Sequence, residues 1–277
     1  MENKTQIAIN FCPTGMVPTK SMTPFVPLSP TEIIEEVHQA YEIGITIAHI
    51  HARDENGKPT HLKSVNQEII EGIKKHCPEL IICASSSGRL VSDFQLRSEV
   101  IELKPDMCSL TLSSLNFGTT ASVNSPETIL NLIEKMNQHG VIPELECFDL
   151  GMINYGKYLI ERGYIQGLKY WNLIFGNIFG MQSDLNSIAA ALNQIPNSNQ
   201  TYISFGGLGK HQFPVNQYGI ISNHGIRIGL EDNLWLDDQK KVLATNIQLL
   251  ERVHDIMEIN GKEFFQPSTF KKQFGMI

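Results

Sequence analysis

The chain has 277 residues, of which 42% are hydrophobic and 18% are charged, and its formal net charge is −7 at pH 7. This is enough apolar material for a sizeable core, and the length suits one large domain or two small ones. An acidic chain without a run of lysine and arginine is a poor candidate for binding nucleic acid or an anionic membrane.

The amino-terminal stretch MENKTQIAINF has no long apolar segment, and no stretch approaches the ~20 apolar residues that a membrane span needs. The five cysteines are odd in number and show no CxxC spacing, which favours buried free thiols in a reducing compartment. We therefore expect a soluble, cytoplasmic protein.

Short β-rich runs alternate with longer amphipathic stretches along the chain. The predicted strands are residues 7–11, 45–51, 80–85, 107–112, 141–148, 168–175, 201–207 and 225–231. After the first strand, Ser29 is a predicted helix N-cap, Pro30 the first helical residue and Gly44 the stop.

The same helix signals recur after the fourth strand, at Ser125, Pro126 and Gly140. A long last helix is expected over 239–261, and the tail after it is expected to pack on the surface.

Eight strands alternating with helices predict a (β/α)₈ TIM barrel, a single domain over residues 1–277. A doubly wound open sheet is the structural alternative, but the strand count and the length favour the barrel. In that fold the active site lies at the C-terminal ends of the strands, so polar residues at those ends are the candidates for function.

Two histidines end the second predicted strand, in the stretch ITIAHIHARDENGKPT. Strand side chains alternate, so His49 and His51 point the same way, about 7 Å apart at Cα. Two imidazoles in this arrangement can bind Zn²⁺ or a similar divalent ion, which needs a third protein ligand and an open position for catalysis. Two hydrogen-bonded structural histidines at a barrel mouth are the alternative.

The eighth predicted strand supplies candidates for that third ligand in RIGLEDN. Strands two and eight both flank strand one in a barrel, and the alternation places Arg227 and Glu231 on one face. Glu231 is therefore the expected third ligand. Asp232 has the opposite parity but could turn inward where the strand ends. An acidic pair at a helix N-terminus is the alternative, but it leaves Arg227 as an unpaired charge inside the barrel.

Other strand ends carry weaker signals. On strand five, Glu144 and Glu146 share a face, and if that face is inward Glu146 lies near the mouth. Small polar residues suited to substrate carboxylates or carbonyls end strands three and four, although turns use the same residue types: Ser85, Gly88, Ser109 and Thr111. The glycines of FGGLGKHQ after strand seven are a weak phosphate-binding signal.

These pieces together resemble the β-keto acid cleavage enzymes, whose best-known branch acts on 3-keto-5-aminohexanoate. The resemblance runs along nearly the whole chain. The stretch HIHARDENGKPT with the late RIGLEDN is specific, and PTGMVPTK, SSSGR, SLNFG, PELECFD and VLATNIQLLER support it.

The resemblance implies a zinc-dependent barrel, usually a homo-oligomer such as a dimer or tetramer. Such an enzyme condenses a β-keto acid with acetyl-CoA and releases acetoacetate and a new acyl-CoA. It implies that His49, His51 and Glu231 hold one Zn²⁺ per chain and that Asp232 is the base, partnered by Arg227. Glu146 matches a further active-site carboxylate, and the substrate contacts are matched by Ser85, Gly88 and Ser109.

We expect the base to take its proton from the acetyl methyl group of acetyl-CoA. The aminohexanoate branch carries a carboxylate in the first βα loop that meets the substrate's ammonium group, whereas this chain has Val17 there. The substrate is therefore expected to be neutral or anionic, and Lys20 or Arg89 could serve an anionic one.

Two other classes of function remain open from the sequence. A metal-dependent hydrolase of the amidohydrolase type also uses an HxH motif, but typically on the first strand and with further histidines on strands five and six. A catalytically inactive barrel acting as a binding protein would be expected to have lost metal ligands. This chain keeps all four candidate site residues, which are His49, His51, Glu231 and Asp232.

Overall fold

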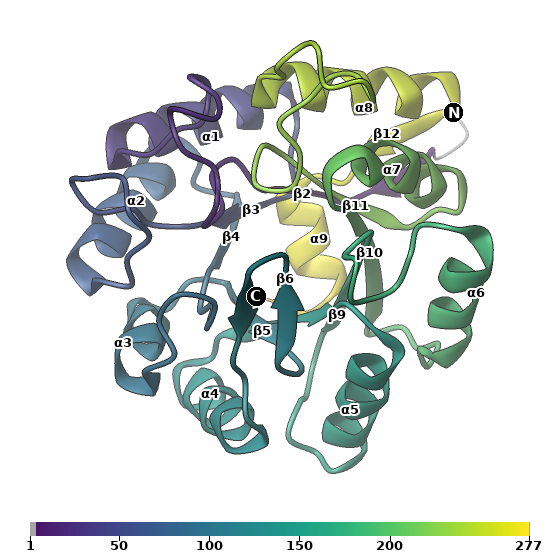
Figure 1. The fold of residues 1–277 in the computed structure, drawn as a ribbon. Coiled ribbons are helices and arrows are strands. Elements are labelled where there is room, and N and C mark those ends of the chain that lie inside the picture. The colour runs from purple at the N-terminus through teal and green to yellow at the C-terminus, as the bar shows by residue number, and fades with distance from the viewer. Residues whose placement is uncertain (1–3, 277) are drawn as a thin grey trace.

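The structure is a computed structural model that describes residues 4–276. Its centre is a closed barrel of parallel strands in the order β10, β11, β2, β3, β4, β5, β8, β9, which confirms the predicted (β/α)₈ barrel (Figure 1). The barrel strands are β2 (Ile9–Phe11), β3 (Ile47–Ile50), β4 (Ile81–Ala84), β5 (Met107–Thr111), β8 (Ile142–Cys147), β9 (Lys169–Phe175), β10 (Thr201–Gly207) and β11 (Gly225–Ile228).

Helices surround the barrel on its outside (Figure 1). They are α1 (Pro30–Ile43), α2 (Lys63–His76), α3 (Phe94–Ser98) continued by a 3₁₀ turn (Glu99–Leu103), α4 (Pro126–His139), α5 (Leu150–Glu161), α6 (Leu185–Gln194), α7 (Gln212–Ile221) after a 3₁₀ turn (Gly209–His211), and α8 (Asn246–Ile259). Among the described residues, no helix combines the length and the apolar character that crossing a membrane requires.

The predicted helix signals are confirmed at α1 and α4. Ser29 accepts a hydrogen bond from the Glu32 amide while the Glu32 side chain returns to the Ser29 amide, so two N-terminal donors are satisfied. Gly140 ends α4 in the left-handed conformation at φ 69°, which glycine adopts without a steric penalty.

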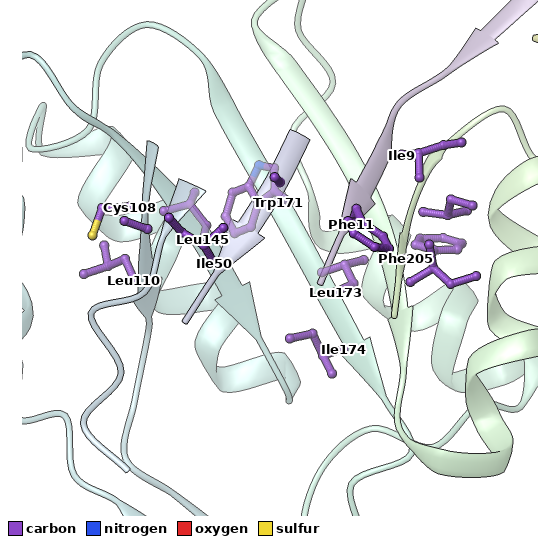
Figure 2. Close-up of a cluster of buried hydrophobic side chains, with 14 of the residues drawn as sticks. Ile9, Phe11, Ile50, Cys108, Leu110, Leu145, Trp171, Leu173, Ile174 and Phe205 are labelled. Atoms are coloured by element: carbon purple, nitrogen blue, oxygen red, sulfur yellow. The ribbon is translucent and has the colours of Figure 1, made fainter. Parts of the chain in front are cut away.

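Strand alternation gives the barrel an apolar outside and an inside that is apolar near the starts of the strands and polar toward their C-terminal ends. Ile9, Phe11 and Leu173 belong to the apolar cluster between strands and helices, as does Trp171, whose side chain is fully buried (Figure 2). The residue between each outward pair points inward, and Asn10 is an example: it is fully buried and bonded across the barrel interior. The apolar contacts on the outside therefore hold the polar interior in register.

The helix predicted over residues 239–261 begins later than expected. Thr245 is its N-cap and forms a capping box with Gln248, so α8 starts at Asn246 and not at residue 239. The preceding stretch instead forms turns around Asp237, whose carboxylate accepts from the amides of Gln239, Lys241 and Val242. Local side-chain bonding of this kind competes with helix formation.

The prediction that the tail packs on the surface is wrong. Helix α9 (Pro267–Gln273) lies within the ring of strands in Figure 1, and its Phe270 is fully buried against Tyr170 and Tyr202 from the start of β9 and β10. A parallel pair outside the barrel, β1 (Thr5–Ile7) with β12 (Lys262–Phe264), leads the chain there. The tail therefore closes the N-terminal end of the barrel.

A short hairpin at the other end was also missed by the sequence analysis. Strands β6 (Leu115–Phe117) and β7 (Thr120–Ser122) pair antiparallel after β5 and overlie the barrel centre in Figure 1. Phe117 and Ser122 line the cavity at the mouth. The hairpin therefore covers part of the end where the predicted site residues lie.

Candidate active site

A cavity of about 390 Å³ opens at the C-terminal ends of the strands. Most of the predicted site residues line it: Val17, His51, Ser85, Glu146, Arg227, Glu231 and Asp232. His49 is buried next to His51, and its ring nitrogen lies close to those of His51 and to the Glu231 carboxylate.

His49, His51 and Glu231 form a compact set of ligand atoms, all within 4.8 Å of one another. The two imidazole Nε2 atoms are 3.1 Å apart, and His51 Nε2 lies 3.2 Å from Glu231 Oε1. His49 Nε2 lies 3.9 Å from Glu231 Oε2. A carboxylate and two imidazoles that converge on one point are the donor set of a catalytic divalent-metal site.

Glu231 reaches the histidines by a turn and not by strand alternation, because β11 ends at Ile228. Gly229 follows at φ 148°, and a Cβ there would collide with the Cys12 carbonyl. The Glu231 amide then donates to that same carbonyl, at 3.2 Å. Glu231 Oε2 is buried without a hydrogen-bond partner, which fits an atom kept free for a metal ion.

Glu144 fixes the orientation of His49. Its Oε2 lies 2.8 Å from His49 Nδ1, so the other ring nitrogen, Nε2, faces His51. Its Oε1 accepts hydrogen bonds from Asn10 and Asn172, at 2.6 and 2.9 Å. A histidine that binds a metal usually donates its second N–H to a carboxylate in this way.

Arg227 is fully inside the barrel and joins the acidic residues of the mouth. It lies 2.7 Å from Glu231 Oε1 through Nη2 and donates through Nε to Asp232 Oδ2 at 2.9 Å. A third carboxylate, that of Glu146, lies 3.7 Å from Nη1 and accepts a hydrogen bond from the Thr111 hydroxyl at 2.7 Å. The buried charge of Arg227 is therefore compensated by carboxylates on the loop after β11 and on β8.

The buried carboxylates differ in pKa. Burial raises the pKa of Asp232 and of Glu146, and Arg227 offsets only part of that rise. For Glu231 burial is outweighed by Arg227 and the two histidines, so its pKa lies well below the usual range. For Glu144 burial is outweighed by His49, which lowers the pKa to about 2. Glu231 is thus held ionised, while Asp232 is more easily protonated than Glu231.

A model of the beta-keto acid cleavage enzymes matches residues 6–276. The chain belongs to this family. The fold and the class of enzyme predicted from the sequence, a barrel acyltransferase, are thereby confirmed.

Relatives within the family cover nearly the whole chain. A 3-keto-5-aminohexanoate cleavage enzyme from Fusobacterium nucleatum is 33% identical over 274 residues, 98% of each chain. Its counterpart from Acetoanaerobium sticklandii is 31% identical over 264 residues, 95% of each chain. A 3-oxoadipate:acetyl-CoA acetyltransferase from Cupriavidus necator is 30% identical over 90% of this chain and 87% of its own.

Among solved structures, ObcA with a C4-CoA adduct and oxalate has a TM-score of 0.76 at 19% identity. The match covers 91% of this chain and 68% of ObcA. At this identity it supports the barrel fold alone.

Two predicted contact residues of this beta-keto acid cleavage enzyme lie behind the cavity wall. Gly88 packs against Arg97, whose Nη1 a Cβ would strike. The Ser109 hydroxyl accepts from the Ser86 amide at 3.0 Å. Both support the loop after β4, in which Ser85 and Ser87 line the cavity, and their contact with substrate stays a prediction.

The glycines at the end of β10 and just after it have structural roles among the described residues. Gly206 faces the Arg227 side chain, and a Cβ at Gly207 would strike the His211 carbonyl. Gly209 takes a positive φ of 56°. The first two allow close packing and the third allows a turn.

The two basic residues considered for an anionic substrate lie in different places. Lys20 pairs with Glu32 at 2.8 Å and borders a separate hollow beside α1. Arg89 lines the main cavity, with its guanidinium carbon 4.1 Å from the centre of the Phe117 ring. Lys20 is thus turned away from the candidate active site and Arg89 is part of it.

Several residues that support the site were missed by the sequence analysis. Arg53 is buried and donates to the carbonyls of Gly15, Pro18 and Gly57, which holds the loop that carries Val17. The Asn246 side chain accepts a hydrogen bond from the Leu230 amide and donates one to the Pro13 carbonyl. Arg53 lies in the recognised HARD motif, but nothing in the sequence pairs it with carbonyls 35 or more positions away.

Proposed function

We propose that this member of the family is a zinc-dependent enzyme that condenses a β-keto acid with acetyl-CoA and releases acetoacetate and a new acyl-CoA. The observation that carries the proposal is the convergence of His49, His51 and Glu231 beside an Arg227-bound Asp232 at one cavity. Family membership and the names of the relatives support the same reaction.

The three ligands fit a divalent metal by their chemistry. Two neutral imidazoles and one carboxylate match the preference of zinc, and a free Glu231 oxygen is directed into the set. Bound there, Zn²⁺ would supply Lewis-acid polarisation of the substrate's keto oxygen.

The products define which bonds change. Acetoacetate and R–CO–SCoA arise from R–CO–CH₂–COO⁻ and acetyl-CoA only if the acetyl carbonyl carbon joins C2 of the keto acid and the C2–C3 bond breaks. The CoA sulfur leaves the acetyl carbon and ends on C3. The proton removed first is therefore one on C2, which lies between the keto group and the carboxylate, and our expectation of the acetyl methyl proton was wrong.

Asp232 is proposed to take that proton. It lines the cavity, and its carboxylate is held by Arg227 through Nε and Nη2 at 2.9 and 3.4 Å, which limits its rotation. When C2 leaves as part of acetoacetate it needs a proton again, and the same Asp232 can return it. Glu146 is proposed as a further active-site carboxylate, positioned by Thr111.

The charge of the substrate tail is proposed from Val17, which lines the cavity and is 44% exposed. An ammonium group placed beside Val17 would lose water without gaining a partner, whereas a neutral tail would bury apolar area favourably. We therefore expect substrates with neutral or anionic tails to be preferred over 5-amino-3-oxohexanoate. Val17→Glu should narrow or reverse this preference in kcat/KM.

The deciding experiment incubates the purified protein with β-keto acids, with and without acetyl-CoA, and measures acetoacetate and acyl-CoA. Acyl transfer requires acetyl-CoA and yields both products in equal amounts. Turnover without acetyl-CoA would instead support the amidohydrolase-type alternative. A metal-free protein that binds ligands without turnover would support the binding-protein alternative.

The metal assignment has its own test. His49→Ala is expected to lose both the metal and turnover, measured by elemental analysis and the same assay. Full metal occupancy in a protein that lacks both His49 and His51 would contradict the proposed ligands. A homo-oligomer and a cytoplasmic location stay predictions.

A further inference from the structure

Arg89 stands out among the residues of the cavity because it is a cation without an anion. Its Nε donates to the Thr120 hydroxyl at 3.3 Å, and no carboxylate among residues 4–276 lies within 4.0 Å of the guanidinium. Its two terminal nitrogens donate to no described side chain or carbonyl. By contrast, Arg227 in the same cavity is already bound by Glu231 and Asp232.

The surroundings of Arg89 fix its orientation. The guanidinium lies over the face of Phe117 on hairpin β6–β7, 4.1 Å from the ring centre, while its backbone amide donates to the Ser87 hydroxyl. Stacking on an aromatic face leaves the edge of a guanidinium free, and that edge is the geometry that binds a carboxylate through two hydrogen bonds. The residue is half-buried, so part of its hydration is already lost without any compensating ion pair.

The remaining wall of the cavity supports a tail with an anionic end. Met16, Val17, Phe148, Ile178 and Leu208 supply an apolar lining around the polar residues. The acidic residues of the cavity are all bonded to Arg227, His51 or Thr111 at the other strand ends. A short methylene tail would contact the apolar lining, and its terminal carboxylate would meet the one cation that has no partner there among the described residues.

We propose that Arg89 binds the second carboxylate of a 3-oxo dicarboxylic acid and so selects diacids among β-keto acids. This inference rests on the proposed function and names the substrate class of the same site. A charge-assisted, two-pronged hydrogen bond of this kind changes binding by roughly 10- to 100-fold.

The test compares two acids that differ only at the tail end, 3-oxohexanedioate and 3-oxohexanoate, with acetyl-CoA as the second substrate. Wild-type protein is expected to prefer the diacid by kcat/KM. Arg89→Gln is expected to raise KM for the diacid by roughly 10- to 100-fold and to change KM for the monoacid less than about threefold. Arg89→Lys should retain part of the preference, since it keeps the charge and loses the fork.

Lys20→Gln is the matched control. It removes the same unit of charge from a neighbouring loop, but Lys20 is bound to Glu32 outside the cavity, so the diacid preference should be unchanged. Metal content and thermal unfolding, measured for each variant, verify that Arg89→Gln leaves the fold and the ligand set intact.

Each alternative role of Arg89 gives a different result. An equal loss with both acids would mean that Arg89 holds the C1 carboxylate, and a rise in KM confined to acetyl-CoA would mean that it holds a CoA phosphate. Either result overturns the inference, as does an absence of diacid preference in the wild type. If neither acid yields acyl-CoA with wild-type protein but other β-keto acids do, the inference alone fails; if none does, the proposed function fails.

Discussion

Glu144 shows how a residue outside the cavity can determine the chemistry inside it. It is fully buried, contacts His49 at 2.8 Å through Oε2 and accepts hydrogen bonds from two asparagines through Oε1. Cys83 also donates to it, at 3.2 Å. Both carboxylate oxygens of Glu144 are thereby engaged by neighbours. The ring of His49 can therefore present only Nε2 to His51 and Glu231.

We predict that Glu144→Gln weakens metal binding by about 10- to 100-fold, because an amide is a poorer acceptor for the His49 N–H and does not raise the basicity of the ring. A metal-competition titration measures this. Glu146→Gln is the control on the same strand: it touches Thr111 and Arg227 and not His49, so metal affinity should stay within a fewfold. Equal losses in the two variants would argue against a role specific to Glu144.

The proposed base, Asp232, and the proposed metal ligand, Glu231, are neighbours in the chain, and one substitution distinguishes their roles. Asp232→Asn keeps the size of the side chain and its contact with Arg227 but removes the proton acceptor. We expect full metal content and a fall in kcat of about 10²-fold or more. Elemental analysis and steady-state kinetics provide the comparison. Loss of the metal would instead place Asp232 in the coordination sphere.

At the residue level the sequence pointed to His49, His51 and Glu231, which the structure groups together, but not to the residues that support them. The two histidines share a face because strands alternate, which needs no knowledge of the neighbours. Asn172 binds Glu144 from the adjacent strand β9, whereas Asn10 binds it from β2, 134 residues away, and only barrel closure brings Asn10 there. Glu231 was chosen by strand parity, whereas the structure delivers it by a turn.

That turn is an element-level feature, and it depends on Gly229. We predict that Gly229→Ala shifts the loop that carries Glu231, because its φ of 148° and the Cys12 carbonyl leave no room for a Cβ. The expected result is a lower midpoint of thermal unfolding together with lost metal.

Gly209→Ala is the matched control for this loop. It also has a positive φ, 56°, but a Cβ there meets nothing within 4 Å. It should cost about 1–2 kcal/mol of stability and leave the metal in place. If Gly229→Ala retains its metal and its stability, the turn is not what positions Glu231.

Elements were predicted well where a local signal exists and poorly where tertiary contacts decide. All eight barrel strands, with the capped helices α1 and α4, follow from periodicity and from Ser, Pro and Gly signals. The start of α8 was wrong because Asp237 organises a competing turn. Hairpin β6–β7 and helix α9 are short and were missed, although Gly118 lies in the hairpin turn and Pro267 begins the helix; packing on the barrel ends stabilises both.

The stability of the whole molecule should depend on pH through His61. Burial lowers the pKa of this histidine to about 4, although its ring donates to the Ser87 carbonyl. Between about pH 6.5 and pH 4 the unfolded chain binds a proton there and the folded chain does not, so stability falls as pH drops. From pH 7 to pH 5 the loss is about 2 kcal/mol.

Chemical denaturation at the two pH values, compared between wild type and His61→Gln, isolates this contribution. Glutamine keeps a donor for the Ser87 carbonyl but does not titrate, so the variant should lose about 2 kcal/mol less between pH 7 and pH 5 than the wild type. The same pH dependence in both proteins would assign the effect to other groups.

Helix α9 also has a kinetic consequence. Because Phe270 packs against Tyr170 and Tyr202 and closes the N-terminal end, we expect substrates to reach the bottom of the cavity from the C-terminal ends of the strands. Whichever molecule occupies the bottom must enter first and leave last. If the keto acid lies beside the ligand set and the bulky thioester reaches it from the mouth, substrates bind in a compulsory order and acyl-CoA departs before acetoacetate. Acetoacetate would then inhibit competitively against the keto acid, and a random pattern of product inhibition would show that the hairpin end offers two independent routes.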